Sequence, residues 1–361
     1  MRTIRFASWR PAIWRDHARQ GKLDEAIKLY EEMRAIDLKK DDASDLAATD
    51  RCVELGTFYL QAGRIDEGRK LFAETGERAK RIREAGKKQD ALNIMNRMLR
   101  SCSNYRLYED GLKYYDQVVS WDDADRGRKD AMEYIVRAAG RAALLIQNDK
   151  AEEAARSLTA VLSRLRKLVD KNSLELAPPM LNLARAYSMT GRLDEAEKIC
   201  EQVVSLSEEQ TGSQSLGTGY AMMWLGRTNA LQGKYTNAEF NFSESLRIMT
   251  QYEEKDPLGM IRLLQEQAAC HSKQGDKAKA IEVLRDALTR CRAWAKNESG
   301  PFAKSSILEI LKALLENADA GDAALKADRE AWVSEANLLY DQLAKDKALN
   351  AEEKNWKEML K

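Results

Sequence analysis

The chain has 361 residues, of which 44% are hydrophobic and 32% charged, and its 59 basic and 58 acidic side chains give a formal net charge of +1. This composition excludes intrinsic disorder, and it argues against a protein that binds nucleic acid through phosphates, which needs a basic excess. No run of about 18 uncharged apolar residues is present, so no membrane span is predicted. The five prolines are few enough for a nearly all-helical chain.

A six-residue phrase recurs along the chain. It reads Gly-Lys-Leu-Asp-Glu-Ala at 21–26 and returns with changes at 63–68, 191–196, 233–238 and 275–280, with weaker copies at 106–111 and 149–154. The last residues of the seven phrases are separated by 42, 43, 43, 42, 42 and 42 positions. A period this constant indicates a repeat architecture.

Each phrase marks the junction between two helices. Its glycine suits the left-handed backbone that follows a helix, and its acidic residues fall in the first turn of the next helix, where the dipole favours negative charge. The small last residue lets two helices approach closely. A second helical pattern lies 13, 12 and 9 residues upstream of that small residue. Each repeat is therefore predicted to be two antiparallel helices.

The prolines agree with these boundaries, because each one lies where a helix is expected to begin. They are Pro11, which opens a short first helix that includes residues 10–20, and Pro178, Pro179, Pro257 and Pro301. The predicted repeats are residues 8–48, 49–91, 92–134, 135–176, 177–218, 219–260, 261–299 and 300–345. The mostly charged residues 346–361 are expected to cap the C-terminal end.

The phrase Gly-x-Leu-Asp-Glu-Ala, with a small residue twelve positions upstream and an aromatic residue nine upstream, resembles the tetratricopeptide repeat. The best match runs from Met180 to Tyr187 and leads into Gly191 and Ala196. The usual repeat has 34 residues. The 42-residue period is similar to the longer repeats of kinesin light chain and of Rap-type peptide-sensing regulators.

This resemblance implies an all-α fold, a right-handed α-solenoid of about eight antiparallel helix hairpins over residues 1–345. Two departures are visible. Repeats three and four lack the turn glycine, and Arg141 takes the place of an apolar core residue in repeat four. HEAT and armadillo arrays share the period, but they do not carry the phrase.

Few residues could support catalysis or metal binding. The two histidines, His17 and His271, occupy the position at which other repeats have tyrosine, which favours a packing role. The five cysteines form no C-x-x-C pair and are predicted to be buried and reduced: Cys52, Cys102, Cys200, Cys270 and Cys291. We therefore expect no enzymatic activity, no metal, no cofactor and a cytoplasmic protein.

The resemblance implies that the first helix of each repeat lines a concave groove. Eleven residues before the small residue, four of seven repeats have arginine. With neighbouring side chains, this stripe predicts eight peptide-binding residues: Asn93, Asn96, Arg100, Asn182, Arg185, Tyr220, Met223 and Arg227. Because a guanidinium fork binds a carboxylate through two parallel hydrogen bonds, the expected ligand is acidic.

The first functional hypothesis is therefore a non-enzymatic scaffold that binds an acidic peptide or protein segment, with no nucleic acid or membrane as partner and no oligomeric state assigned. The alternative, which the resemblance implies, is a peptide-sensing regulator of the Rap type. Such regulators carry an additional N-terminal effector domain, whereas the repeats here begin by about residue 8. That difference favours the scaffold.

Overall fold

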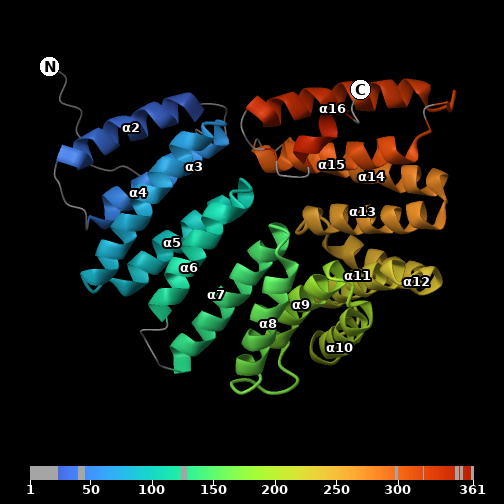
Figure 1. Cartoon of the computed structure of the whole chain (residues 1–361), viewed down its shortest axis with the longest axis horizontal. Helices are drawn as coiled ribbons and strands as arrows, with labels where there is room; N and C mark the ends of the chain where they lie inside the picture. The colour runs from blue at the N-terminus through green and yellow to red at the C-terminus, as the bar shows by residue number, and fades with distance from the viewer. Residues whose placement is uncertain are drawn as a thin grey trace. The chain divides into compact units, whose positions relative to one another are not determined.

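The fold is described from a computed structural model, which describes residues 23–39, 45–122, 128–296, 300–319, 321–345, 349 and 353–358. All regular elements within these ranges are helices, so the predicted all-α fold of helix hairpins is confirmed (Figure 1). Within these ranges, no helix has an apolar stretch that could span a lipid bilayer. The predicted first helix at 10–20, with Arg15 and His17, lies outside the described residues.

The chain divides into two compact units, Met1–Leu107 with Lys345–Ala348, and Tyr108–Ala344 with Leu349–Lys361. The described helices of the first unit are α2 (Leu23–Lys39), α3 (Leu46–Gln61), α4 (Ile65–Glu84) and α5 (Lys88–Asn104). The helices of the second unit are α6 (Tyr108–Asp122), α7 (Arg128–Gln147), α8 (Ala151–Leu165), α9 (Ala177–Met189), α10 (Leu193–Thr211), α11 (Leu216–Leu231), α12 (Tyr235–Met249), α13 (Pro257–Gln274), α14 (Lys277–Ala295), α15 (Pro301–Asn317) and α16 (Lys326–Lys345). Short 3-10 helices, η1 (Leu174–Leu176), η2 (Thr250–Tyr252) and η3 (Glu353–Glu358), complete it.

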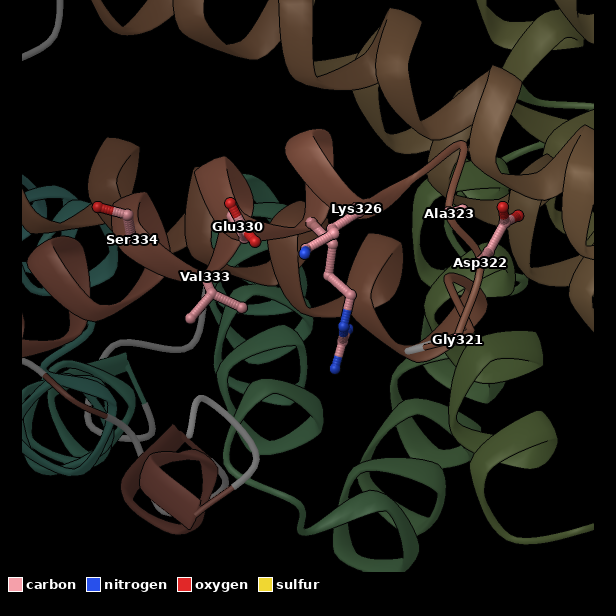
Figure 2. A pocket seen from close by; sticks show the side chains of 8 residues that line it. Gly321, Asp322, Ala323, Lys326, Glu330, Val333 and Ser334 are labelled. Atoms are coloured by element: carbon pink, nitrogen blue, oxygen red, sulfur yellow. The ribbon is translucent and has the colours of Figure 1, made fainter.

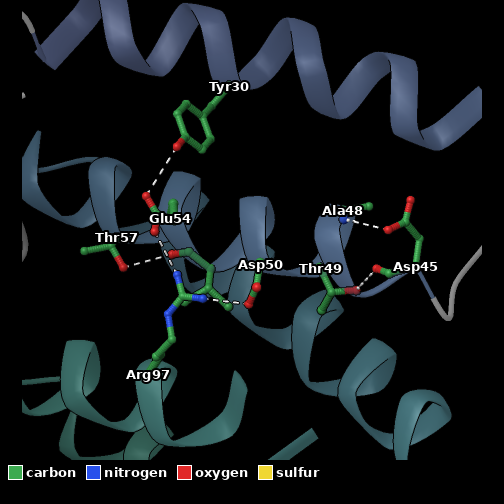
Figure 3. A network of polar contacts seen from close by, with 9 residues as sticks. Tyr30, Asp45, Ala48, Thr49, Asp50, Glu54, Thr57 and Arg97 are labelled. Atoms are coloured by element: carbon green, nitrogen blue, oxygen red, sulfur yellow. Dashed lines mark hydrogen bonds and ion pairs between the residues drawn. The ribbon is translucent and has the colours of Figure 1, made fainter. Parts of the chain in front are cut away.

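Polar contacts join three helices of the first unit (Figure 3). The guanidinium of Arg97 on α5 donates to Asp50 at 2.6 Å and to Glu54 at 2.9 Å, both on α3. The hydroxyl of Tyr30 on α2 donates to the same Glu54 at 3.3 Å. The ring of Tyr30 also packs edge-on against Phe58, so one tyrosine contributes to both the apolar core and the polar network.

In repeats two to seven, the turn before the second helix keeps a left-handed backbone. Gly63, Gly191, Gly233 and Gly275 have φ between 76° and 86°. In repeats three and four, which lack the glycine, Arg106 and Asp149 adopt φ of 59° and 56°. The turn conformation is therefore retained where its usual residue is absent, although a side chain is strained there.

Small residues let the two helices of a hairpin come into close contact. In the hairpin of α11 and α12, the ring of Phe242 lies against Gly226, where an added Cβ would be 3.0 Å from the ring carbon Cδ1. In the hairpin of α3 and α4, a Cβ on Gly56 would overlap the ring of Phe72. Both glycines have ordinary helical backbone conformations, so the backbone does not call for glycine there. What the missing side chain provides is space for the aromatic ring.

Arg141 of α7 shows how repeat four tolerates a charge at a core position. Its guanidinium pairs with Asp116 of α6 and with Glu153 of α8, so it lies at the edge of the hairpin. The next residue, Ala142, is fully buried, as is Leu145 to within 1%. The apolar register of the helix is therefore preserved around the arginine.

The C-terminal segment, predicted as a charged cap, is anchored by η3. Glu353 and Trp356 are buried, and the Ser305 hydroxyl of α15 donates to the Glu353 carboxylate. The ammonium of Lys312 lies 4.7 Å from the centre of the Trp356 ring. Specific side chains of α15 therefore hold η3 in place.

The two phenylalanines of α12 provide a direct test of the hairpin contact. Phe242→Ala removes a ring with 0% exposure from the α11–α12 contact, and we expect it to lower the free energy of unfolding by about 3–5 kcal/mol. Phe240→Ala, two residues away on the opposite face and 65% exposed, is the matched control, with a change within about 0.5 kcal/mol. Urea denaturation followed by circular dichroism measures both values. Equal losses in the two variants would contradict the hairpin packing.

Candidate functional site

Three first helices of consecutive repeats, α9, α11 and α13, pack side by side in the second unit. They carry five of the eight predicted binding residues, Asn182 and Arg185 on α9 and Tyr220, Met223 and Arg227 on α11. Prolines lie in the first turns of α9 and α13, so these two helices begin where the sequence predicted.

The ring of Trp224 on α11 contacts arginines from two of these helices. The guanidinium carbons of Arg185 and Arg227 lie 5.6 Å and 5.3 Å from the centre of its ring. Each cation–π contact contributes about 0.5–1 kcal/mol at an exposed site and more when water is excluded. We call Arg185, Trp224, Arg227, Arg262 and Glu266 the arginine–tryptophan cluster.

The cations of this cluster differ in their partners. Arg227 donates to the carboxylate of Glu266 on α13 in a partly buried ion pair. Arg185 is also partly buried, but it has no hydrogen bond or ion pair with any residue in the described part of the chain. Arg262 is exposed and likewise makes no ion pair within that part of the chain.

The environment of Arg185 disfavours its positive charge. Burial, and then the charges of Arg262 and Arg227, lower the pKa of Arg185 to about 10, whereas Glu266 acts in the opposite direction. The side chain remains protonated at neutral pH. Because the pKa in the folded state lies below the ordinary value, this cation reduces the stability of the folded protein at that pH.

Tyr220, a predicted binding residue, forms a hydrogen bond within the protein. Its hydroxyl donates to Asp256, whose other carboxylate oxygen accepts from the backbone N–H of Gly259 at 3.1 Å and caps α13. Burial and this hydrogen bond raise the pKa of Tyr220. A Cβ on Gly259 would overlap both the Tyr220 hydroxyl and the Asp256 carboxylate, so a larger residue there would displace these two groups.

One predicted binding residue, Met223, is fully buried. Met223 is 0% exposed, whereas the next residue, Trp224, is largely buried at 9% exposure and contacts two arginines. The surface stripe of α11 therefore follows the spacing i, i+4, i+7 through Tyr220, Trp224 and Arg227. Trp224, Arg262 and Glu266 were not among the predicted residues, although the helical spacing from Tyr220 and Arg227 points to Trp224.

The other three predicted residues, Asn93, Asn96 and Arg100, are exposed on α5 of the first unit. The side-chain oxygen of Asn93 accepts from Gln89 at 3.1 Å. Arg97, which lies between them in sequence, is already paired with Asp50 and Glu54. These three residues form a separate stripe on the first unit.

A surface hollow of about 550 Å³ lies at the start of α16 (Figure 2). Its lining combines Lys326 and Arg329 with Asp322 and Glu330, so it favours no sign of charge. It contains none of the predicted binding residues. Among the residues that the structure describes, no group of three or more His, Cys, Asp or Glu side chains is placed to hold a metal ion.

Removing the charge of Arg185 is expected to stabilise the protein. Arg185→Met keeps the apolar stem and removes a partly buried cation that lies among like charges, and we expect the free energy of unfolding to rise by about 1 kcal/mol. Arg192→Met is the control, because Arg192 is exposed, pairs with Glu195 and lies 3.8 Å from the centre of the Tyr187 ring. This variant is expected to lower the stability slightly, because it removes an exposed ion pair and a ring contact. Thermal unfolding of both variants checks the opposite signs.

Comparison with known proteins agrees with the geometry. A tetratricopeptide repeat profile matches residues 134–209 and 217–293, and a PPR repeat profile matches residues 16–38. No curated protein is significantly similar to the chain in sequence.

Two solved structures share the fold at low identity, and a third matches a smaller part of the chain. NprR in complex with its cognate peptide NprX is 15% identical, with a TM-score of 0.52 over 97% of this chain and 96% of NprR. A tetratricopeptide repeat protein from Parabacteroides merdae is 17% identical, with a TM-score of 0.50 over 84% of this chain and 96% of that protein. The TPR-like repeats of a Podospora anserina protein described as a kinesin light chain are 18% identical and cover 58% of this chain and 97% of that one, with a TM-score of 0.45. The matched segments identify tetratricopeptide repeats at residues 134–209 and 217–293, within the array of helix hairpins.

Proposed function

We propose that this protein is a non-enzymatic interaction scaffold that binds a peptide or protein segment on the surface of α9, α11 and α13 through a carboxylate of the ligand. The observation that carries the proposal is Arg185, a partly buried cation without an anionic partner in the described chain. It lies against Trp224, beside two further arginines of the cluster.

A carboxylate fits this position better than other groups. An uncompensated, partly buried charge costs stability, and an incoming anion would remove that cost. The planar guanidinium binds a carboxylate through two parallel hydrogen bonds. Asn182, which is partly buried one turn before Arg185, has an amide that could bond the ligand backbone.

The expected affinity follows from these contacts. A hydrogen bond to a charged group contributes about 1.5–3 kcal/mol, so two or three such bonds with an aromatic contact correspond to dissociation constants from about millimolar to micromolar. Arginine cannot serve as a general base, so the proposal assigns the cluster a binding role. The five buried cysteines suit a reducing compartment, and we propose that the protein acts in the cytoplasm.

The proposal is tested with a glutamate-containing peptide and its glutamine counterpart, both acetylated and amidated so that the side chains supply the only carboxylates. Isothermal titration calorimetry is expected to show binding of the glutamate peptide that is about tenfold tighter than that of the glutamine peptide. Arg185→Met should remove most of this preference.

The matched control for this experiment is Arg156→Met, which removes an exposed arginine of α8 outside the cluster. It should leave the affinity unchanged. A wild-type protein without any preference for the acidic peptide, or equal losses in the two variants, would refute the proposal.

A second candidate function, a peptide sensor, is favoured by the similarity to NprR bound to its cognate peptide. In a sensor, the ligand binds one arrangement of the helices more tightly and shifts the population toward it. We therefore expect the radius of gyration from small-angle X-ray scattering to change when saturating glutamate peptide is added. An unchanged scattering curve at full occupancy would rule out the sensor function and remain consistent with the scaffold function.

A further inference from the structure

We propose that Arg227 is a positioning residue that holds Glu266 away from Arg185 and so keeps the Arg185 guanidinium open for the carboxylate of the ligand. This inference rests on the proposed function, because it concerns the same site. It gives Arg227 a different role from the direct ligand contact that the arginine stripe predicts.

One internal carboxylate, that of Glu266, interacts with two cations of the cluster. Arg185 and Arg227 lie over the same Trp224 ring, and the Glu266 carboxylate accepts from Arg227. The charge of Glu266 also acts on Arg185. Glu266 is only 16% exposed, so water does not fully satisfy it once its partner is lost. Without Arg227, it would therefore pair with another cation nearby.

Arg185 is the favoured alternative partner. Arg262, one turn before Glu266 on α13, is exposed, and an exposed i, i+4 ion pair contributes only about 0.3–0.5 kcal/mol. Arg185 is less exposed, so an ion pair there is screened less by water. A carboxylate on Arg185 would occupy the position that the ligand needs.

The other acid of this surface is not available as a competitor. One oxygen of Asp256 accepts from Tyr220 and the other from the backbone of Gly259 at the start of α13. Releasing Asp256 would break the helix cap, which costs about 1 kcal/mol. Glu266 is therefore the carboxylate whose partner decides whether Arg185 is open.

A double-mutant cycle with Arg227→Gln and Glu266→Gln tests the inference, with the same glutamate and glutamine peptides as probes. Arg227→Gln is expected to weaken binding of the glutamate peptide about tenfold, because the released Glu266 occupies Arg185. The double variant Arg227→Gln with Glu266→Gln should recover wild-type affinity or exceed it. Arg227→Lys, which still offers Glu266 a cation, should stay within about threefold of wild type.

Two results would overturn the inference while leaving the proposed function intact. If the double variant binds as weakly as Arg227→Gln, then Arg227 contacts the ligand directly. If Arg227→Gln binds as tightly as wild type, then Glu266 does not reach Arg185. If the wild-type protein shows no preference for the glutamate peptide over the glutamine peptide, both proposals are overturned. Thermal unfolding of each variant shows that it is folded, and recovery in the double variant excludes a folding defect as the cause.

Discussion

The structure depends on the close approach of two helices at one small residue in each hairpin. Where the first helix has a glycine at the contact, an aromatic ring of the second helix lies directly on its backbone, as Phe242 does on Gly226. Such contacts tolerate little change in volume, because protein interiors are densely packed. The period of 42 or 43 residues repeats this contact, so within the second unit the first helices α7, α9, α11 and α13 each pack against the next.

The sequence predicted this fold because its signals are local and repeated. The left-handed turn was expected at each glycine, yet it also forms at Arg106 and Asp149. There the next residue donates its backbone N–H to a carbonyl five residues earlier, as Leu107 does to Cys102 at 2.8 Å and Lys150 to Leu145 at 2.9 Å. Arg192 makes the same bond to Tyr187 after Gly191. The hydrogen bond that closes the helix therefore outweighs the strain of a side chain in the left-handed region.

The candidate site was predicted less completely, because its details depend on rotation about a helix axis. The spacings i, i+3, i+7 and i, i+4, i+7 both fit a helical stripe, and they differ by one residue, or about 100° of rotation. That difference separates Met223, which is buried, from Trp224, which lies between two guanidinium groups. The pair of Arg227 and Glu266 joins different repeats, so no spacing within one helix indicates it.

The arginine–tryptophan cluster also shows why repeated arginines at one position need not be equivalent. Arg185 and Arg227 occupy the same place in consecutive repeats, but only Arg227 faces a carboxylate of the following repeat. The residue that would serve Arg185 in the same way is Trp224, which offers a ring instead of a negative charge. A ring stabilises the cation without neutralising it. The exchange of one side chain between neighbouring repeats thus converts a structural ion pair into a cation that remains available to a ligand.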